Sequence, residues 1–260
     1  HLVHSINDRD DPTLFYSPYI HFVDEYAAEQ FAARDAQTPF RAYFIGGGGF
    51  SLPRAWAETY ANAELIVAEL DPAVTEAARD RLWLKTDHPA LRIHHRDARA
   101  LLQEMPAAAR FDVVFGDAFR DIAIPSHLIT REFNREIATR LKPGGFYVVN
   151  VVDMGSNPRF LAAFIRTLKQ DFKSVEVWAE AEELAGSQQG NARRVTFIVV
   201  AGDRPSAVPP RLFSRRGIER EWARWPARGF QARYMDAPIL TDDFAPVDRL
   251  MAPLLLTSED

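Results

Sequence analysis

The sequence predicts an α/β fold built on a mostly parallel sheet. From about residue 40 to residue 200, short apolar runs alternate with helical patterns, which is typical of strand–helix–strand units. The first apolar run ends in four glycines, Gly46 to Gly49, and the second ends in Glu69. We expect a buried strand, a tight turn and a helix N-terminus there, because glycine lets the backbone turn sharply and approach a ligand. Together these elements predict a βαβ unit able to bind a nucleoside.

The order of the expected elements narrows the fold further. Seven strands are expected, at 42–46, 64–69, 91–95, 111–116, 145–152, 174–179 and 194–201. The expected helices are 52–60, 73–83, 97–104, 126–141 and 157–170. Only a loop over 180–192 separates the last two strands, so they predict an antiparallel hairpin at the sheet edge. This is the pattern of the class I S-adenosylmethionine-dependent transferase fold, a Rossmann-like fold whose last strand is antiparallel.

The two ends of the chain are expected to flank this unit. Residues 1–38 are predicted to form an N-terminal β segment, because polar and apolar residues alternate around 14–22. Residues 39–203 form the expected Rossmann-like cofactor-binding domain. Residues 204–260 form a C-terminal extension with one amphipathic helix near 214–225, whose arginines are expected to lie on a solvated face.

The composition excludes several classes of function. The chain has 260 residues, 31 of them basic and 36 acidic, and no cysteine. Disulfides, thiolate metal sites and cysteine nucleophiles are therefore excluded. The charges are spread evenly, which indicates no nucleic-acid partner, and the histidines show no metal-ligand spacing. No apolar run is long enough to span a bilayer, but the chain begins at His1 and can be a fragment of a longer parent.

Polar side chains close three of the expected strands. Glu69 is placed to accept hydrogen bonds from ribose hydroxyls. Asp97 can accept from an adenine amino group, and it can also cap the helix that follows. Asp117 faces either the cofactor or a substrate amine, or it caps the next turn. The expected cofactor-binding residues are Gly46, Gly47, Gly48, Gly49, Glu69, Leu70, Asp97, Ala98 and Asp117.

These motifs resemble the spermidine synthase (aminopropyltransferase) family. The resemblance covers roughly residues 40–200, with a weaker similarity over 1–25, and is strongest to the spermidine synthase-like domains of bacterial membrane-fused proteins. The segments 124–133 and 241–247 also resemble those relatives. The resemblance implies two catalytic residues, Asp117 as the group that takes a proton from the amine and Tyr16 as the substrate-side tyrosine.

Three departures from the family pattern concern the amine site. Gly49 stands where the family has an Asp in the glycine loop, and Arg120 stands where it has a second catalytic Asp. Ser17-Pro18 replaces a His-Glu pair. A diamine needs carboxylates to replace its hydration, and this chain has lost several. Without a carboxylate at Gly49, discrimination against the α-carboxylate of S-adenosylmethionine is also relaxed.

The resemblance implies a transferase in polyamine biosynthesis. Its co-substrate would be decarboxylated S-adenosylmethionine or S-adenosylmethionine, with no metal, and its acceptor a small amine or polyamine. It further implies a cytoplasmic location and a homodimer, and it allows a membrane portion in a longer parent chain. Three alternatives stay open, namely a methyltransferase, a non-catalytic nucleoside-binding domain of a larger membrane protein, and a nicotinamide-dependent oxidoreductase.

Overall fold

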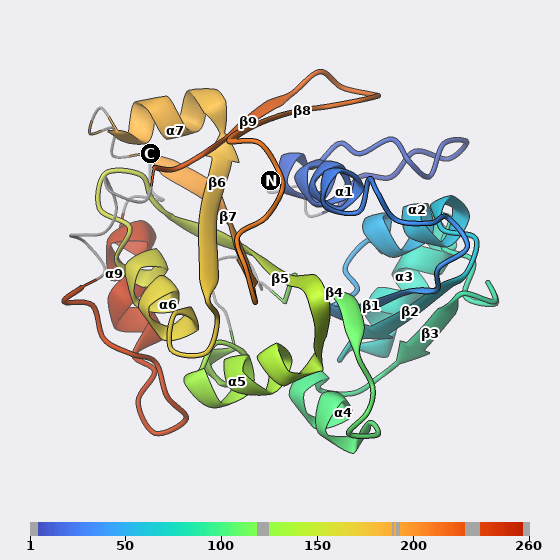
Figure 1. Cartoon of the computed structure of the whole chain (residues 1–260), viewed down its shortest axis with the longest axis horizontal. Helices are drawn as coiled ribbons and strands as arrows, with labels where there is room; N and C mark the ends of the chain where they lie inside the picture. Colours follow the sequence, from blue (N-terminus) through green and yellow to red (C-terminus); the bar gives the residue numbers. More distant parts are fainter. Residues whose placement is uncertain (1–4, 119–124, 189, 191–192, 227–234, 257–260) are drawn as a thin grey trace.

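A mixed sheet of nine strands forms the centre of the molecule, in the order β3-β2-β1-β4-β5-β7-β6-β9-β8 (Figure 1). The computed structural model describes residues 5–118, 125–188, 190, 193–226 and 235–256. The strands are β1 (Phe40–Ile45), β2 (Ala63–Ala68), β3 (Leu91–His94), β4 (Phe111–Gly116), β5 (Leu141–Met154), β6 (Ser174–Glu180), β7 (Arg194–Gly202), β8 (Arg211–Phe213) and β9 (Glu221–Arg224).

The sheet confirms the seven predicted strands and adds two. Strands β3, β2, β1, β4 and β5 are parallel, and β7 runs antiparallel to both β5 and β6. The antiparallel last strand was expected, but its place was wrong: β7 lies inside the sheet, between β5 and β6. This order also differs from the six parallel strands of a nicotinamide dinucleotide fold.

Helices cover both faces of the sheet. One face carries α1 (Pro18–Gln30), α2 (Ser51–Thr59) and α3 (Pro72–Arg81), and the other carries α4 (Ala98–Glu104), α5 (Arg131–Arg140), α6 (Arg159–Leu168) and α9 (Val247–Leu256). Alternate residues of the buried strands pack into two hydrophobic clusters, one on each face of the sheet. Tyr43 and Ile45 of β1 belong to the cluster with α4 to α6, whereas Phe44 packs with α1 and α2.

The N-terminal region differs from the prediction. The expected β segment over 14–22 is wrong, because α1 begins at Pro18. The ring of Pro18 fixes a helical φ at the first helical position, where the missing N–H costs nothing. An isolated bridge between Asn7 and Phe15 is the strand-like pairing in this part of the described chain.

The C-terminal extension also differs from the prediction. The amphipathic helix expected near 214–225 is wrong, since Glu221–Arg224 is strand β9, which pairs with β6 and with β8. Part of the loop expected over 180–192 is the helix α7 (Ala181–Gln188). Because β8 and β9 extend the central sheet, this region continues the same unit, and the boundaries at 38 and 203 stay a prediction. Within the described ranges, no helix has both the length and the apolar character that crossing a bilayer needs.

Candidate active site

The glycine loop joins β1 to α2 and packs against the end of β4. Gly46 has φ 93°, in the region that favours glycine, and its amide donates to the carbonyl of Ala68 at 2.9 Å. A Cβ at Gly46 would lie 2.7 Å from the carbonyl oxygen of Asp117. Glycine is therefore required here, because two strand ends meet with no room for a side chain.

Glu69 lies beside this loop, as its position at the end of β2 predicted. Its Oε2 accepts from the amides of Gly47 at 2.8 Å and Gly48 at 3.3 Å, and its Oε1 accepts from the amide of Asp71 at 2.9 Å. The carboxylate is buried, whereas the next side chain, Leu70, is 58% exposed. An acceptor and an exposed apolar side chain thus stand next to each other, which suits the ribose and the base of a nucleoside.

Asp97 lies between β3 and α4 and caps that helix, which is one of the two roles considered for it; the adenine contact stays a prediction. Its Oδ1 accepts from the amide of Ala100 at 3.0 Å, which caps α4. Its Oδ2 lies 2.7 Å from Nε2 of His127. Burial works against the charged form, but these two hydrogen bonds outweigh it and lower the pKa of Asp97. The neighbouring Ala98 is buried in the core, and its carbonyl accepts from the hydroxyl of Tyr43.

Asp117 follows β4 and lies beside the glycine loop. Burial raises the pKa of its carboxyl group to about 7, hydrogen bonds from Tyr19 and Asn150 work in the opposite direction, and the charge of Glu69 raises the pKa further. The hydroxyl of Tyr19 lies 3.2 Å from Oδ2 of Asp117. Burial and the Asp117 carboxylate raise the pKa of Tyr19 well above its usual value, so this phenol stays protonated and donates.

Asn150 was not predicted as a site residue. It lies on β5, which pairs with β4, and its side chain is 6% exposed. Its Oδ1 has no hydrogen-bond partner among the described residues, although its side chain bonds Asp117. A buried carbonyl oxygen without a partner is costly, so it is suited to accept from a bound donor. The sequence signal was a lone amide within the apolar run Val148–Val152.

Tyr16, the tyrosine that the resemblance singled out, points elsewhere. Its hydroxyl lies 3.4 Å from Oδ2 of Asp8, and its carbonyl accepts from Arg220. Tyr19, three residues later and in the first turn of α1, is the tyrosine that bonds Asp117. A catalytic role for Tyr16 therefore stays a prediction without a supporting contact.

A narrow pocket lies between Tyr19, Asp117 and the glycine loop, whereas Glu69, Asp97 and Asn150 are not among its lining residues. It is lined by the glycine loop, the start of α2, Tyr19 and Asp117, together with Ser5 and Ser17. At the position where the resemblance implied an acidic residue, a Cβ on Gly49 would lie 2.5 Å from the Cβ of Ser5. Arg120 and Asp121 lie outside the described residues. In the described part of the chain, no group of three His, Asp or Glu side chains is arranged to hold a metal ion.

No family model matches the chain. Its sequence is 31% identical over 144 residues to a polyamine aminopropyltransferase of Vibrio vulnificus, which covers 55% of this chain and 48% of that protein. It is 23% identical over 205 residues to a polyamine aminopropyltransferase of Aeropyrum pernix, which covers 76% of this chain and 62% of that protein. The chain thus spans about half the length of the first of these relatives.

Solved structures show the fold. A probable spermidine synthase from Corynebacterium glutamicum superposes with a TM-score of 0.74 at 22% identity, over 91% of this chain and 84% of that one. Human methyltransferase-like protein 13, solved in complex with SAH, superposes with a TM-score of 0.57 at 18% identity, over 75% of this chain and 87% of that one. The fold is therefore that of the class I S-adenosylmethionine-dependent transferases. The sequence relatives support a relationship with the polyamine aminopropyltransferases.

Proposed function

We propose that this chain is a spermidine synthase-like transferase that moves an aminopropyl group to an amine acceptor. The hydrogen bond between Tyr19 and Asp117, beside the glycine loop, is the observation that carries the proposal. A carboxylate with a raised pKa can hold an amine and then accept a proton from it. The similarity to polyamine aminopropyltransferases gives this pair a reaction in which an amine must lose a proton.

The nucleoside part of the co-substrate fits the other strand ends. Glu69 would accept from the ribose hydroxyls, Asp97 would accept from the adenine amino group, and Leu70 would cover the base. Gly46 to Gly49 would let the backbone approach the sulfonium end. Each of these residues lies at the carboxyl edge of the parallel strands, where ligands of such sheets bind.

The chemical step needs orientation more than activation. The acceptor nitrogen attacks the carbon beside the sulfonium, the new N–C bond forms, and the C–S bond breaks to release methylthioadenosine. The positive charge passes from sulfur to nitrogen, and the nitrogen gives its proton to Asp117. Asn150 would accept a second N–H of the amine and so fix its direction. Most of the acceleration would come from this alignment, because the sulfonium is already an activated leaving group.

A methyltransferase on the same fold is the second candidate, favoured by the surroundings of Gly49. No carboxylate stands at this loop position, and Ser5 fills the space in front of it. The α-carboxylate of S-adenosylmethionine would therefore meet no like charge here. In that case Asp117 would accept a proton from the methyl acceptor.

Calorimetric titration of the purified chain with S-adenosylmethionine and with its decarboxylated form tests the proposal. Tighter binding of the decarboxylated form, followed by turnover with a panel of diamines and polyamines, supports aminopropyl transfer. Asp117→Asn should then abolish turnover, while the Kd for the nucleoside stays within about 3-fold of the wild-type value. Loss of a hydrogen bond to a charged group would change the Kd by more than this. Asp80→Asn, on the exposed side of α3, is the matched control.

Other outcomes of this titration decide between the alternatives. Tighter binding of intact S-adenosylmethionine would favour methyl transfer, and nucleoside binding without turnover would favour a non-catalytic domain of a larger protein. Binding of neither compound would refute the co-substrate assignment. A homodimer, a cytoplasmic location and a membrane portion in a longer parent chain stay predictions from the resemblance.

A further inference from the structure

We propose that the hairpin β8–β9 is a positioning element for the acceptor side of the site. Its arginines hold helix α1 at the place where Tyr19 meets Asp117. The proposal rests on the function proposed above, in which this pair handles the acceptor amine. It assigns a role to the two strands that the sequence did not predict, and to the arginines that were expected on a solvated helix face.

Two buried carboxylates on α1 are the point of attachment. Asp24 is 2% exposed and Glu25 is fully buried. A buried carboxylate is stable in its charged form only when it is paired and hydrogen-bonded. Burial works against the charged form of Glu25, but hydrogen bonds from His21 and Arg215 outweigh it, so the pKa of Glu25 is lowered. The cations that pair with both groups come from the turn between β8 and β9.

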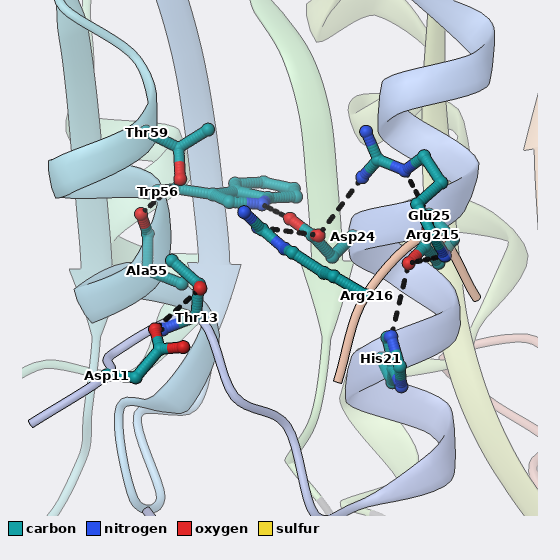
Figure 2. A network of polar contacts seen from close by, with 10 residues as sticks. All are labelled: Asp11, Thr13, His21, Asp24, Glu25, Ala55, Trp56, Thr59, Arg215 and Arg216. Atoms are coloured by element: carbon teal, nitrogen blue, oxygen red, sulfur yellow. Dashed lines mark hydrogen bonds and ion pairs between the residues drawn. The ribbon is translucent and has the colours of Figure 1, made fainter. Parts of the chain in front are cut away.

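Arg215 and Arg216 provide this pairing, which Figure 2 shows from close by. Arg215 makes two hydrogen bonds to Glu25. Its backbone amide donates to Oε1 at 2.9 Å, and its Nε donates to Oε2. Both arginines also reach Oδ2 of Asp24 at 3.3 Å. On the other side of Asp24, Trp56 of α2 donates from Nε1 to Oδ1 at 2.9 Å. Helix α1 is thus fixed between the hairpin and α2.

A second set of contacts with the hairpin lies just before the beginning of the same helix. Arg220 of the hairpin donates to the carbonyl of Tyr16 at 2.9 Å and to Oε1 of Glu180 at 2.9 Å. Glu180 ends β6, so this contact ties the segment before α1 to the central sheet. The guanidinium is mostly buried, with 16% of the Arg220 side chain exposed.

Along the chain, Tyr19 lies between these two sets of contacts with the hairpin. The Arg220 contact is three residues before it, and the contact to Asp24 is five residues after it. A helix transmits a shift along its axis, because its backbone hydrogen bonds keep it rigid. Loss of either set of arginine contacts should therefore move the Tyr19 hydroxyl relative to Asp117. A misplacement of about 1 Å in a positioned group can lower a rate by as much as about 100-fold.

The test compares Arg215→Gln with Arg211→Gln. Arg211 lies on the same hairpin but pairs with Glu221 of β9 and not with a carboxylate of α1, so it is the matched control. We expect Arg215→Gln to lower kcat/KM for the acceptor amine by between about 10- and 100-fold. The affinity for methylthioadenosine should stay unchanged, and Arg211→Gln should behave like the wild type.

A double-mutant cycle with Tyr19→Phe separates positioning from a general loss of structure. If Arg215 acts through Tyr19, Arg215→Gln should cost less than about 2-fold in the Tyr19→Phe background. An equal cost in both backgrounds, or a parallel loss of methylthioadenosine binding, would overturn the proposal. Where Arg215→Gln fails to fold, Glu25→Gln/Arg215→Gln replaces it, because this variant leaves no unpaired charge from that pair.

Hydrogen exchange gives a result that does not depend on turnover. Faster exchange of backbone amides at the first turns of α1 in Arg215→Gln than in Arg211→Gln supports the role of the hairpin in holding α1. If the wild-type chain transfers no aminopropyl group, the proposed function fails while this measurement still tests the hairpin. Equal exchange in the two variants would refute the role of the hairpin.

Discussion

The hydroxyl of Tyr19 and Oδ2 of Asp117 lie 3.2 Å apart, although 98 positions separate the two residues in the chain. Tyr19 belongs to helix α1, which packs beside the sheet, and Asp117 directly follows the central strand β4. A protonated phenol thus donates a hydrogen bond to a carboxyl group whose pKa is raised to about 7 by burial. An acceptor amine placed here would find one donor and one proton acceptor side by side.

Tyr19→Phe should move the pH dependence of the reaction. The Tyr19 hydrogen bond lowers the pKa of Asp117, so its removal should raise that pKa above about 7. Because the base acts as a carboxylate, activity disappears as the pH falls through this value. The acidic limb of kcat/KM should therefore shift to higher pH, and kcat/KM at pH 7 should fall about 10-fold. Tyr16→Phe is the control, and a larger shift in that variant would reverse our assignment.

Asp117→Asn should stabilise the protein at neutral and alkaline pH. The pKa of Asp117 is about 7 in the folded state against 3.8 for an ordinary Asp, so the folded state binds this proton more tightly. The stability contributed by this group is present below pH 4 and is lost as the pH rises through 7. Asn cannot ionise and avoids that loss. We expect Tm to rise by about 2 to 6 °C at pH 8 and by less at pH 5. A lower Tm at pH 8 would contradict the pKa assignment.

Glu69→Gln should weaken nucleoside binding. Gln keeps one acceptor oxygen but loses the charge, and hydrogen bonds to a charged group are worth about 1.5 to 3 kcal/mol. The Kd for methylthioadenosine should rise by roughly 10- to 100-fold. Thermal unfolding is needed alongside, since Glu69 also holds the amides of Gly47 and Gly48. Glu76→Gln, exposed on α3, is the control, and equal affinities for the two variants would remove Glu69 from the site.

Gly46→Ala should destabilise the protein more than Gly190→Ala. Both glycines have positive φ, at 93° and 86°, so each substitution meets a similar backbone cost of about 1 to 2 kcal/mol. A Cβ at Gly46 would also lie 2.7 Å from the Asp117 carbonyl, whereas a Cβ at Gly190 would meet no atom of the described residues within 4 Å. Chemical denaturation of the two variants isolates the second effect. Equal losses would mean that the loop is free to move away from β4.

All seven predicted strands appear within a few residues of their predicted positions. The sequence predicts β1 and β4 most clearly, because they are buried on both faces and are therefore nearly continuous apolar runs. Glu69 and Asp97 lie at the carboxyl edge of the parallel strands, as predicted from their positions after β2 and β3, whereas their roles in ligand binding stay a prediction. These features depend on local sequence and on one general rule of topology.

The errors occurred where long-range contacts decide the structure. Helix α1 is buried from Ile20 to Ala27, including its polar side chains His21, Asp24 and Glu25, so it lacks the exposed polar face of an ordinary surface helix. The arginines at 216, 220 and 224 have helical spacing, but their partners lie on α1 and β6. Strand β9 forms because β6 offers a free edge, and this pairing joins residues more than 40 positions apart. For the same reason Tyr16 could not be told from Tyr19 before the path of α1 was known.

The contact between Gly46 and the main chain of Asp117 has a consequence for how two ligands influence each other. The loop proposed to bind the nucleoside and the strand end proposed to bind the amine approach each other there without an intervening side chain. We expect an adjustment of the loop to move Asp117 as well. We therefore expect the two binding equilibria to be coupled, and by thermodynamic reciprocity each ligand should change the affinity for the other by the same factor.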